Sequence, residues 1–506
     1  MSLILMGRRR GGISLGAGEI AIALHRFASG TGSTLCGLGV PLRPGDLLPA
    51  NIGNVSLTLD GQGEVAIYAE ALEGRYSDGS ARSLYIEVDG GTMTRGTPRT
   101  GVLRLHTPFT VARRTISSDV DRASWQSNGP VSTGAFSGWR DAGTGTPPGV
   151  IVASSPAHNC AAMAWLGPML PQSSWPSFSG SADYITSFQS TLDTTVRAHD
   201  GSLLAGTSYP RDIALLRWWA ATGDIGILET ALQWMARMRT MYWAPNAWST
   251  PDSRLAQQPV AASYFLRRDT EARTALVGTN NVTGLLFTQA RTDGTAWDAL
   301  TGRVEARGLA QRLRTLTYAQ TLGVSYHFNL IDGTIATGVN QHAERISNSL
   351  GWNGSTFEWG APGCTSTIIS RFFMLALLAD SVRELVGVSA PSSDLTTFLG
   401  RIDTMLEWMR GQTIVSPNGV TTFPYDTVAS CDGTTNPTVD LNGFHPHLFA
   451  WRAARLGVTA DANLARTLLA TVTTGTPGSF LSGQKQWDEG FAWSPLTFSY
   501  LAQAGI

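Results

Sequence analysis

The chain has 506 residues, of which 42% are hydrophobic and 15% are charged, and its formal net charge is -1. This size allows two to four domains, and the hydrophobic fraction supports large folded cores rather than extensive disorder. A chain without excess positive charge has no electrostatic basis for binding nucleic acid or an anionic membrane surface. No run is long and apolar enough for membrane insertion, and Lys485 is the only lysine.

The opening residues, MSLILMGRRRGG, have an apolar part that is too short for a secretory signal and that precedes the arginines. We therefore expect a cytoplasmic protein, or a virion component that leaves its host without a conventional signal. The cysteines lie far apart, without a CxxC pair or a Cys/His cluster, so we expect isolated buried thiols; one long-range disulfide stays open. They are Cys36, Cys160, Cys364 and Cys431.

Residues 13–115 show the alternation of apolar and polar side chains that is typical of half-buried strands. Asp-Gly pairs at 60–61, 78–79 and 89–90 are turn signals beside these strands. The sequence therefore predicts an antiparallel β-barrel or sandwich over residues 1–116. Its expected strands lie in VSLTLDG (55–61), GEVAIYAEAL (63–72), SLYIEVDG (83–90) and GVLRLHTPFTVARRTI (101–116).

Residues 117–207 are rich in Ser, Thr, Gly and Pro, with WRDAGTGTPPG (139–149) near the centre. Two short apolar pieces, VIVAS (150–154) and CAAMAWLG (160–167), indicate further strands. We interpret this segment as a second β element, or as a long ordered crossover that leads into the helical part of the chain.

The stretch from Ser208 to Trp243 predicts a helical hairpin. Apolar residues recur at steps of three and four in both of its halves, which places them on one face of each helix. Gly223 can end the first helix, and Asp224 can cap the second. Because both helices have an apolar face, the hairpin requires neighbours of the same kind.

Further helices are expected as far as the C-terminus, and their unequal spacing argues against a regular solenoid. Paired helices bury both apolar faces most economically in a closed (α/α) toroid, which we predict for residues 208–506. The fold class is then multidomain α+β. The helices are expected at 303–323, 365–388, 392–412, 447–472 and 491–505, with less regular candidates at 257–290 and 341–350.

Three motifs follow one another within residues 39–88, namely PLRPG (41–45), AE (69–70) and YSDGSAR (76–82). Together they resemble the N-terminal β-barrel domain of the exo-rhamnogalacturonan lyase-like family. Tyr76 stands where that family usually has Trp, and Ser83 replaces a closing aromatic residue. The resemblance implies a β-barrel followed by an (α/α) toroid. It supports architecture more than activity, because the family's chemistry does not occur in this β domain.

Two kinds of chemistry fit a polysaccharide substrate. A lyase needs a base for the proton α to a carboxylate and a cation for that carboxylate, and we predict His327 or His445 as the base and Arg211 as the cation. A hydrolase needs two carboxylates across the scissile bond. Arg211 also opens a predicted helix, so a local ion pair is an alternative. The carboxylates expected for hydrolysis are Glu358 with Asp488 or Glu489.

Sugar recognition requires flat apolar side chains beside hydrogen-bonding groups. Fourteen of the sixteen tryptophans follow residue 150, and most are expected to pack between helices. His445 and His447 are spaced like two ligands of one metal ion, but no third ligand has a diagnostic spacing. We therefore expect neither a metal nor another cofactor. The substrate-binding residues predicted from polar stretches are Tyr209, Tyr326, Trp359, Asn442, Trp487 and Trp493.

Together, these features predict a carbohydrate-active protein that binds and cleaves a cell-surface or pectin-like polysaccharide, by lyase-type β-elimination rather than hydrolysis. The alternative is a non-catalytic glycan-binding component of a phage tail, such as a fibre, spike or receptor-binding protein. The Ser/Thr/Gly-rich tracts at 91–207 and 411–440 suggest this alternative. A homo-oligomer, or attachment to other virion proteins, would fit it.

Overall fold

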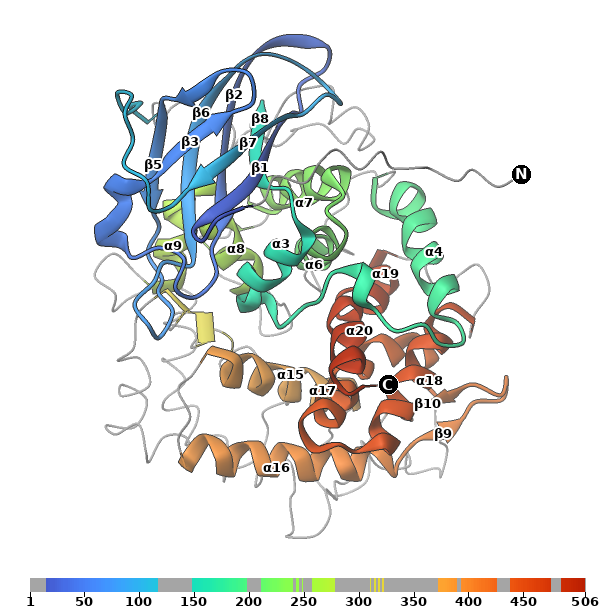
Figure 1. The fold of residues 1–506 in the computed structure, drawn as a ribbon. Coiled ribbons are helices and arrows are strands. Elements are labelled where there is room, and N and C mark those ends of the chain that lie inside the picture. Colours follow the sequence, from blue (N-terminus) through green and yellow to red (C-terminus); the bar gives the residue numbers. More distant parts are fainter. Residues whose placement is uncertain are drawn as a thin grey trace.

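The structure is a computed structural model in which a β domain near the N-terminus lies against a larger helical part (Figure 1). This layout confirms the predicted combination of a β domain followed by helices. The residues that the structure describes are 15–116, 148–197, 211–239, 243–244, 248, 257–277, 310, 314, 317–318, 321–322, 372–388, 393–425, 437–474 and 484–505.

The β domain is one mixed sheet of eight strands in the order β4-β3-β7-β1-β8-β2-β6-β5. Its two edge strands, β4 and β5, are separated in the chain only by Ala66, so the sheet nearly closes on itself. Alternate residues of the strands form its core, including Ile22, Leu57 and Ile86. The strands are β1 (Glu19–Arg26), β2 (Thr31–Pro41), β3 (Ser56–Leu59), β4 (Gly63–Val65), β5 (Ile67–Ala71), β6 (Ser83–Thr94), β7 (Arg99–Arg104) and β8 (Gly149–Ala153).

The expected strand at 150–154 exists as β8, but it belongs to the N-terminal sheet rather than to a second β element. It lies between β1 and β2, antiparallel to the first and parallel to the second, which makes the sheet mixed rather than purely antiparallel. All five of its residues are buried. The sheet therefore includes residues from beyond the predicted boundary at 116.

The strand predicted at 160–167 is wrong, because these residues are helical. Ser155 caps helix α3 (Pro156–Ala162) by accepting a hydrogen bond from the backbone N–H of His158, and Pro156 occupies the first turn. The 3₁₀-helix η2 (Ala164–Leu166) follows. A short apolar run cannot distinguish a strand from a buried helix by periodicity alone, and here the cap and the proline decide.

The predicted hairpin is confirmed as helices α6 (Arg211–Thr222) and α7 (Ile225–Met238). Gly223 has a positive φ of 74° at the end of α6, where a side chain would be strained. The side chain of Asp224 accepts a hydrogen bond from the backbone N–H of Gly226 at 2.8 Å. The two helices pack along their length, and α3 packs against α6.

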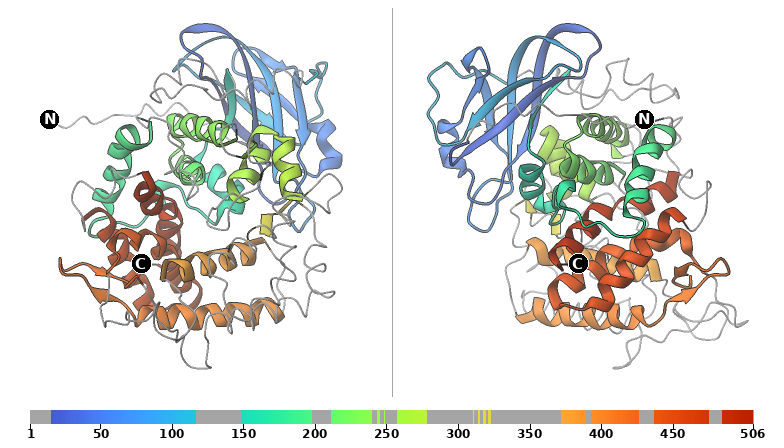
Figure 2. Two further views of the ribbon diagram at one scale, coloured as in Figure 1. Left: turned by 180° about the vertical axis from the view of Figure 1, so that it is seen from behind. Right: turned by 45° about the vertical axis from the view of Figure 1, so that its right-hand side comes forward.

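Further helices follow α7, and neighbouring ones in the chain pack against each other (Figure 2). Of those expected at 365–388 and 392–412, the described parts, 372–388 and 393–410, are helices, and those expected at 447–472 and 491–505 are confirmed; most of 303–323 and all of 341–350 lie outside the described residues. No helix in the described ranges is long and apolar enough to span a membrane. Helix α4 (Ser181–Thr191) and the π-helical turn η4 (Leu192–Arg197) precede the hairpin, and the helices after it are α8 (Gln257–Arg267), α9 (Thr270–Val277), α15 (Phe372–Val388), α16 (Ser393–Arg410), α17 (Pro446–Leu456), α18 (Thr459–Thr474), α19 (Gln484–Phe491) and α20 (Ser494–Gln503).

Cys36 and Cys160 are free, buried thiols, as expected, while the other two cysteines lie outside the described residues.

Short elements complete the described chain. The Ser/Thr-rich stretch after α16 contains a two-stranded hairpin. The short elements are η1 (Pro49–Asn54), η3 (Gln172–Ser174), β9 (Ile414–Val415), β10 (Thr421–Thr422) and η6 (Val439–Phe444).

The β domain is fixed to the helical part through α8 and α9. The Ser83 hydroxyl donates to the carbonyl of Phe265 at 2.7 Å, and the backbone N–H of Glu73 donates to the Tyr264 hydroxyl at 2.8 Å. The guanidinium of Arg268 binds Glu70 at 2.6 Å. These contacts join residues about two hundred positions apart, so the two parts form a continuous core.

Gly39 lies at this junction, where β2 touches the end of α8. A Cβ atom at this position would overlap the carbonyl oxygen of Phe265, so we expect Gly39→Ala to destabilise the protein by about 1–3 kcal/mol. Thermal unfolding followed by circular dichroism would measure the loss. Gly53→Ala is the matched control, because no atom lies within 4 Å of a Cβ there. Equal midpoints for the two variants would contradict the tight junction.

Candidate functional site

Two residues from opposite ends of the helical part meet in the interior. Arg211 begins α6 and Asp488 lies in α19, 277 positions later. Nε of Arg211 donates to Oδ1 of Asp488 at 2.6 Å, and Nη2 donates to Oδ2 at 3.2 Å, which makes the ion pair bidentate. Both side chains are fully buried. The structure therefore brings together two of the predicted catalytic residues.

Aromatic side chains enclose this ion pair. The guanidinium carbon of Arg211 lies 4.5 Å from the ring centre of Trp234 and 5.7 Å from that of Trp487. Trp487 is itself buried, and its Nε1 donates to the Thr191 hydroxyl at 3.1 Å. Trp487, which was predicted as a sugar contact, therefore packs beside the Arg211 guanidinium in the protein interior.

Asp212 adds a second carboxyl at the start of α6. It is buried, and its Oδ1 accepts the backbone N–H of Ile213 at 3.0 Å. Its Oδ2 is buried and has no hydrogen-bond partner within the described ranges. Such an oxygen is an open acceptor, or a donor once it is protonated. The residues just before Asp212 in the chain, 201–210, lie outside the described residues.

Both carboxyls titrate near neutral pH. Burial, together with a smaller effect of the Asp488 charge, raises the pKa of Asp212 to about 7. Burial also raises the pKa of Asp488 to about 7, although Arg211 opposes this shift. The pKa of a carboxyl is ordinarily near 4, so both groups are displaced toward the range where acid–base catalysts operate.

The raised pKa of Asp212 makes stability depend on pH. Between about pH 4 and pH 7 the folded state binds a proton at Asp212 that the unfolded chain does not, so this contribution is full below pH 4 and is lost as the pH rises to 7. We expect the free energy of unfolding of the wild type, relative to Asp212→Asn, to fall by up to ~1.4 kcal/mol per pH unit in this window. Thermal melts of both proteins would measure the difference. A pH-independent difference would contradict the shift.

Glu489 follows Asp488 in α19 and is also fully buried. A Cβ atom at Gly443 would overlap the Glu489 carbonyl oxygen, so α19 and η6 approach each other very closely. The polar stretch that contains these two acidic residues, Gln484–Phe491, is a helix. Its helical backbone is what fixes Asp488 opposite Arg211.

Asn442 lies in η6, and His445 directly follows this element. Burial lowers the pKa of His445 to about 3, and its ring centre lies 4.4 Å from that of Phe423. Asn442 is buried and binds Thr422, the backbone of Thr421 and Thr471. A neutral imidazole with so low a pKa is a weak base, and the Asn442 amide holds β10, η6 and α18 together.

Asp380 in α15 is the centre of a buried polar cluster that the sequence interpretation missed. Its carboxylate binds four groups within 2.9 Å. Burial would raise its pKa, but Arg383, His447 and Arg314 hold it well below the usual range. The four groups belong to Arg314, Arg383, His447 and Trp493, the last of which was predicted to contact substrate.

Glu384 extends this cluster by one helical turn. Its carboxylate binds Nε of Arg314 at 3.0 Å and the amide of Gln258 at 2.5 Å. A signal for the cluster exists in the sequence. Three charged residues, Asp380, Arg383 and Glu384, interrupt the otherwise apolar run FFMLALLADSVRELVGV at helical spacing. Charges within a fully buried helix must be paired with each other.

The remaining predicted site residues cannot be placed. In the described part of the chain, no group of three or more His, Cys, Asp or Glu side chains could hold a metal ion. The residues that lie outside the described part are His327, Glu358, Tyr209, Tyr326 and Trp359. Their predicted roles stay predictions.

No family model, curated protein or solved structure matches this chain.

Proposed function

We propose that this chain is a carbohydrate-active enzyme that cleaves a polysaccharide by acid–base chemistry at Asp212 and Asp488. One observation supports this most strongly: Asp488 is paired with Arg211, the neighbouring Asp212 is buried and feels the charge of Asp488, and the pKa of each carboxyl is raised to about 7. A carboxyl that titrates near neutral pH can donate a proton in one form and accept one in the other. Glycoside hydrolysis requires these two roles of its carboxyl pair.

The architecture is the reason for proposing a glycan as the substrate. A nearly closed β domain followed by paired helices is the order that the exo-rhamnogalacturonan lyase-like family implies. We propose that the helix pairs close into a toroid with a sugar-binding groove at one end. Tyr209, Glu358 and Trp359 would then complete the groove, together with the residues just before Asp212.

Hydrolysis fits the described residues better than the elimination favoured by the sequence. His445 is buried beside Phe423 and, with a pKa near 3, would be a weak base. The guanidinium of Arg211 already binds Asp488 in a bidentate pair, which leaves it a poor partner for a substrate carboxylate. His327 keeps its predicted role as the alternative base for elimination.

Assays on a panel of bacterial surface polysaccharides and pectic glycans would test the proposal. Reducing ends and the absorbance of unsaturated uronates are followed in the same reaction. Hydrolysis produces reducing ends without the unsaturated product. An unsaturated product would indicate elimination instead. Glycan binding without either signal across the panel would overturn the enzyme proposal in favour of a glycan-binding tail component.

A further inference from the structure

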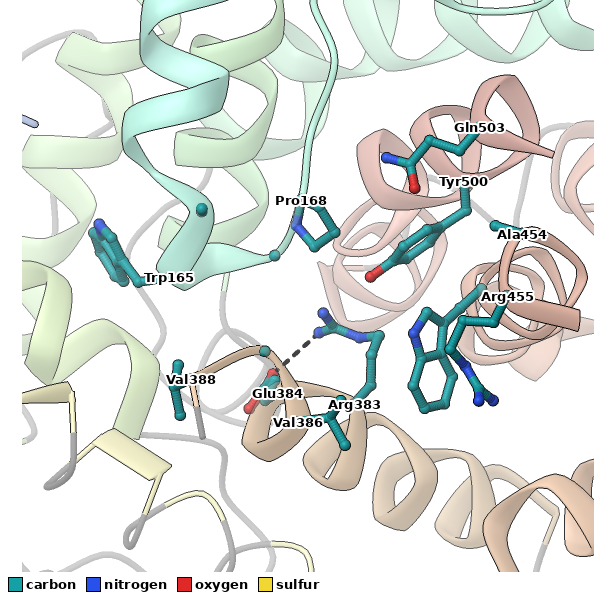
Figure 3. A pocket seen from close by; sticks show the side chains of 14 residues that line it. Trp165, Pro168, Arg383, Glu384, Val386, Val388, Ala454, Arg455, Tyr500 and Gln503 are labelled. Atoms are coloured by element: carbon teal, nitrogen blue, oxygen red, sulfur yellow. Dashed lines mark ion pairs between the residues drawn. The ribbon is translucent and has the colours of Figure 1, made fainter. Parts of the chain in front are cut away.

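A second site lies apart from the Asp212–Asp488 pair. It is a cavity of about 220 Å³ between η2 and the ends of α15, α17 and α20 (Figure 3). Pro168, Gly387 and Gln503 are exposed at its mouth, whereas Trp165 and Trp451 are buried in its lining. Neither Asp212 nor Asp488 belongs to the lining, so the proposed catalytic function does not explain this cavity.

The floor of the cavity is polar and buried. Arg383, Glu384 and Tyr500 line it, and Figure 3 shows the Arg383 guanidinium directed toward Glu384, with the Tyr500 hydroxyl pointing toward the guanidinium. Nε of Arg383 donates to Asp380 at 2.7 Å. Nη2 lies 3.5 Å from Glu384 and has no hydrogen-bond partner among the described residues. A buried guanidinium beside a tyrosine hydroxyl on the floor of a cavity is suited to an anionic ligand.

Next to the floor of the cavity, buried positive side chains outnumber buried negative ones. In the part of the chain that the structure describes, three buried arginines face two carboxylates, Asp380 and Glu384. Burial raises the pKa of Glu384, which weakens the negative side further. Asp380 and Glu384 raise the pKa of Arg383 and of Arg314 against the effect of burial, whereas burial lowers the pKa of Arg217 to about 10, so the charge that the two carboxylates leave unbalanced is that of Arg217. The three arginines are Arg217, Arg314 and Arg383.

We propose that this cavity binds a small monocarboxylate. Its carboxylate accepts hydrogen bonds from Arg383 and Tyr500, and its compact body lies between Trp165 and Trp451. The volume of about 220 Å³ suits a compact ligand such as a single ring, and the apolar lining from Val386, Val388 and Ala454 suits a ring face. A sugar acid and an aromatic acid share this chemistry, so the experiment separates them.

Isothermal titration calorimetry of the full chain with sodium glucuronate and sodium benzoate would test the site. Each acid is compared with a neutral counterpart, methyl glucoside or benzamide. We expect one of the two acids to bind and its neutral counterpart to bind at least about tenfold more weakly, because the charge-assisted hydrogen bonds are lost. Absence of binding by both acids, or equal binding of the neutral compounds, would overturn the proposal.

Variants at the mouth and the floor of the cavity would show whether the acid binds there. A Cβ atom at Gly387 would meet nothing within 4 Å, so Gly387→Phe can place a ring in the mouth, and binding should weaken at least about tenfold. Gly400→Phe is the matched control, since Gly400 is also helical and equally open but does not line the cavity. Tyr500→Phe removes one donor and should weaken binding about fivefold. Unchanged affinity in both Gly387→Phe and Tyr500→Phe would contradict the site.

Discussion

Replacing Asp212 by asparagine is expected to lower the rate of polysaccharide cleavage by about 10²–10⁴-fold, because an amide cannot exchange a proton with the substrate. Asparagine has nearly the shape of aspartate, and the hydrogen bond from Ile213 to Oδ1 can remain. The loss should therefore appear in kcat rather than in the fold. Initial rates of reducing-end formation, scaled to the folded fraction, would measure it.

Asp488→Asn should cause a loss of the same order, and it also removes the charge partner of Arg211. Asp461→Asn is the matched control. Asp461 is equally buried and binds Arg410 and Arg452, but it lies in α18, outside the proposed pair. The pH–rate profile should have its flanks near pH 7, where both carboxyls titrate. Full activity in both Asp212→Asn and Asp488→Asn would exclude the pair as catalytic.

Asp380→Ala should be among the most destabilising single changes in this chain, by about 3–5 kcal/mol. The substitution leaves the guanidiniums of Arg314 and Arg383 without their shared carboxylate in the dry interior. It also removes the acceptor for the His447 imidazole and the Trp493 indole. Urea unfolding followed by helical circular dichroism would measure the shift in midpoint.

The control for this loss is Asp193→Ala. Asp193 also binds an arginine, Arg197, at 2.6 Å, but its side chain is 72% exposed, and exposed pairs contribute little. Its midpoint should match that of the wild type. If Asp380→Ala unfolds at the same urea concentration as Asp193→Ala, the cluster around Asp380 is not a major source of stability.

The sequence predicts the elements whose signals are local. Alternation identified β3 to β7 of the β domain, and the Gly223–Asp224 pair identified the α6–α7 joint, where the glycine has positive φ and the aspartate caps. Each of these signals depends only on residues within a few positions. The placement of β8 between β1 and β2 depends on pairings across more than one hundred positions, which no local pattern contains.

For the candidate site too, the sequence predicts individual residues but not the contacts between distant parts of the chain. Arg211 and Asp488 could be predicted as candidate site residues because each is a charged residue in a polar stretch that also contains aromatic residues. Their pairing over 277 positions could not be inferred. Trp487 and Trp493 were predicted as sugar contacts, yet both are buried with their indole N–H groups bonded inside the protein. The composition of the surrounding sequence does not show whether a tryptophan ring lies on the surface or is buried in the protein interior.

The position of β8 sets an order for folding during synthesis. β1 and β2 have emerged from the ribosome long before residues 149–153, which must later enter between them. Until then these two strands lack the neighbour that joins them, and unpaired strand edges favour association with other chains. A fragment that ends at residue 116 would remain permanently in this state. The β domain is N-terminal in the sequence, but its sheet cannot be completed first.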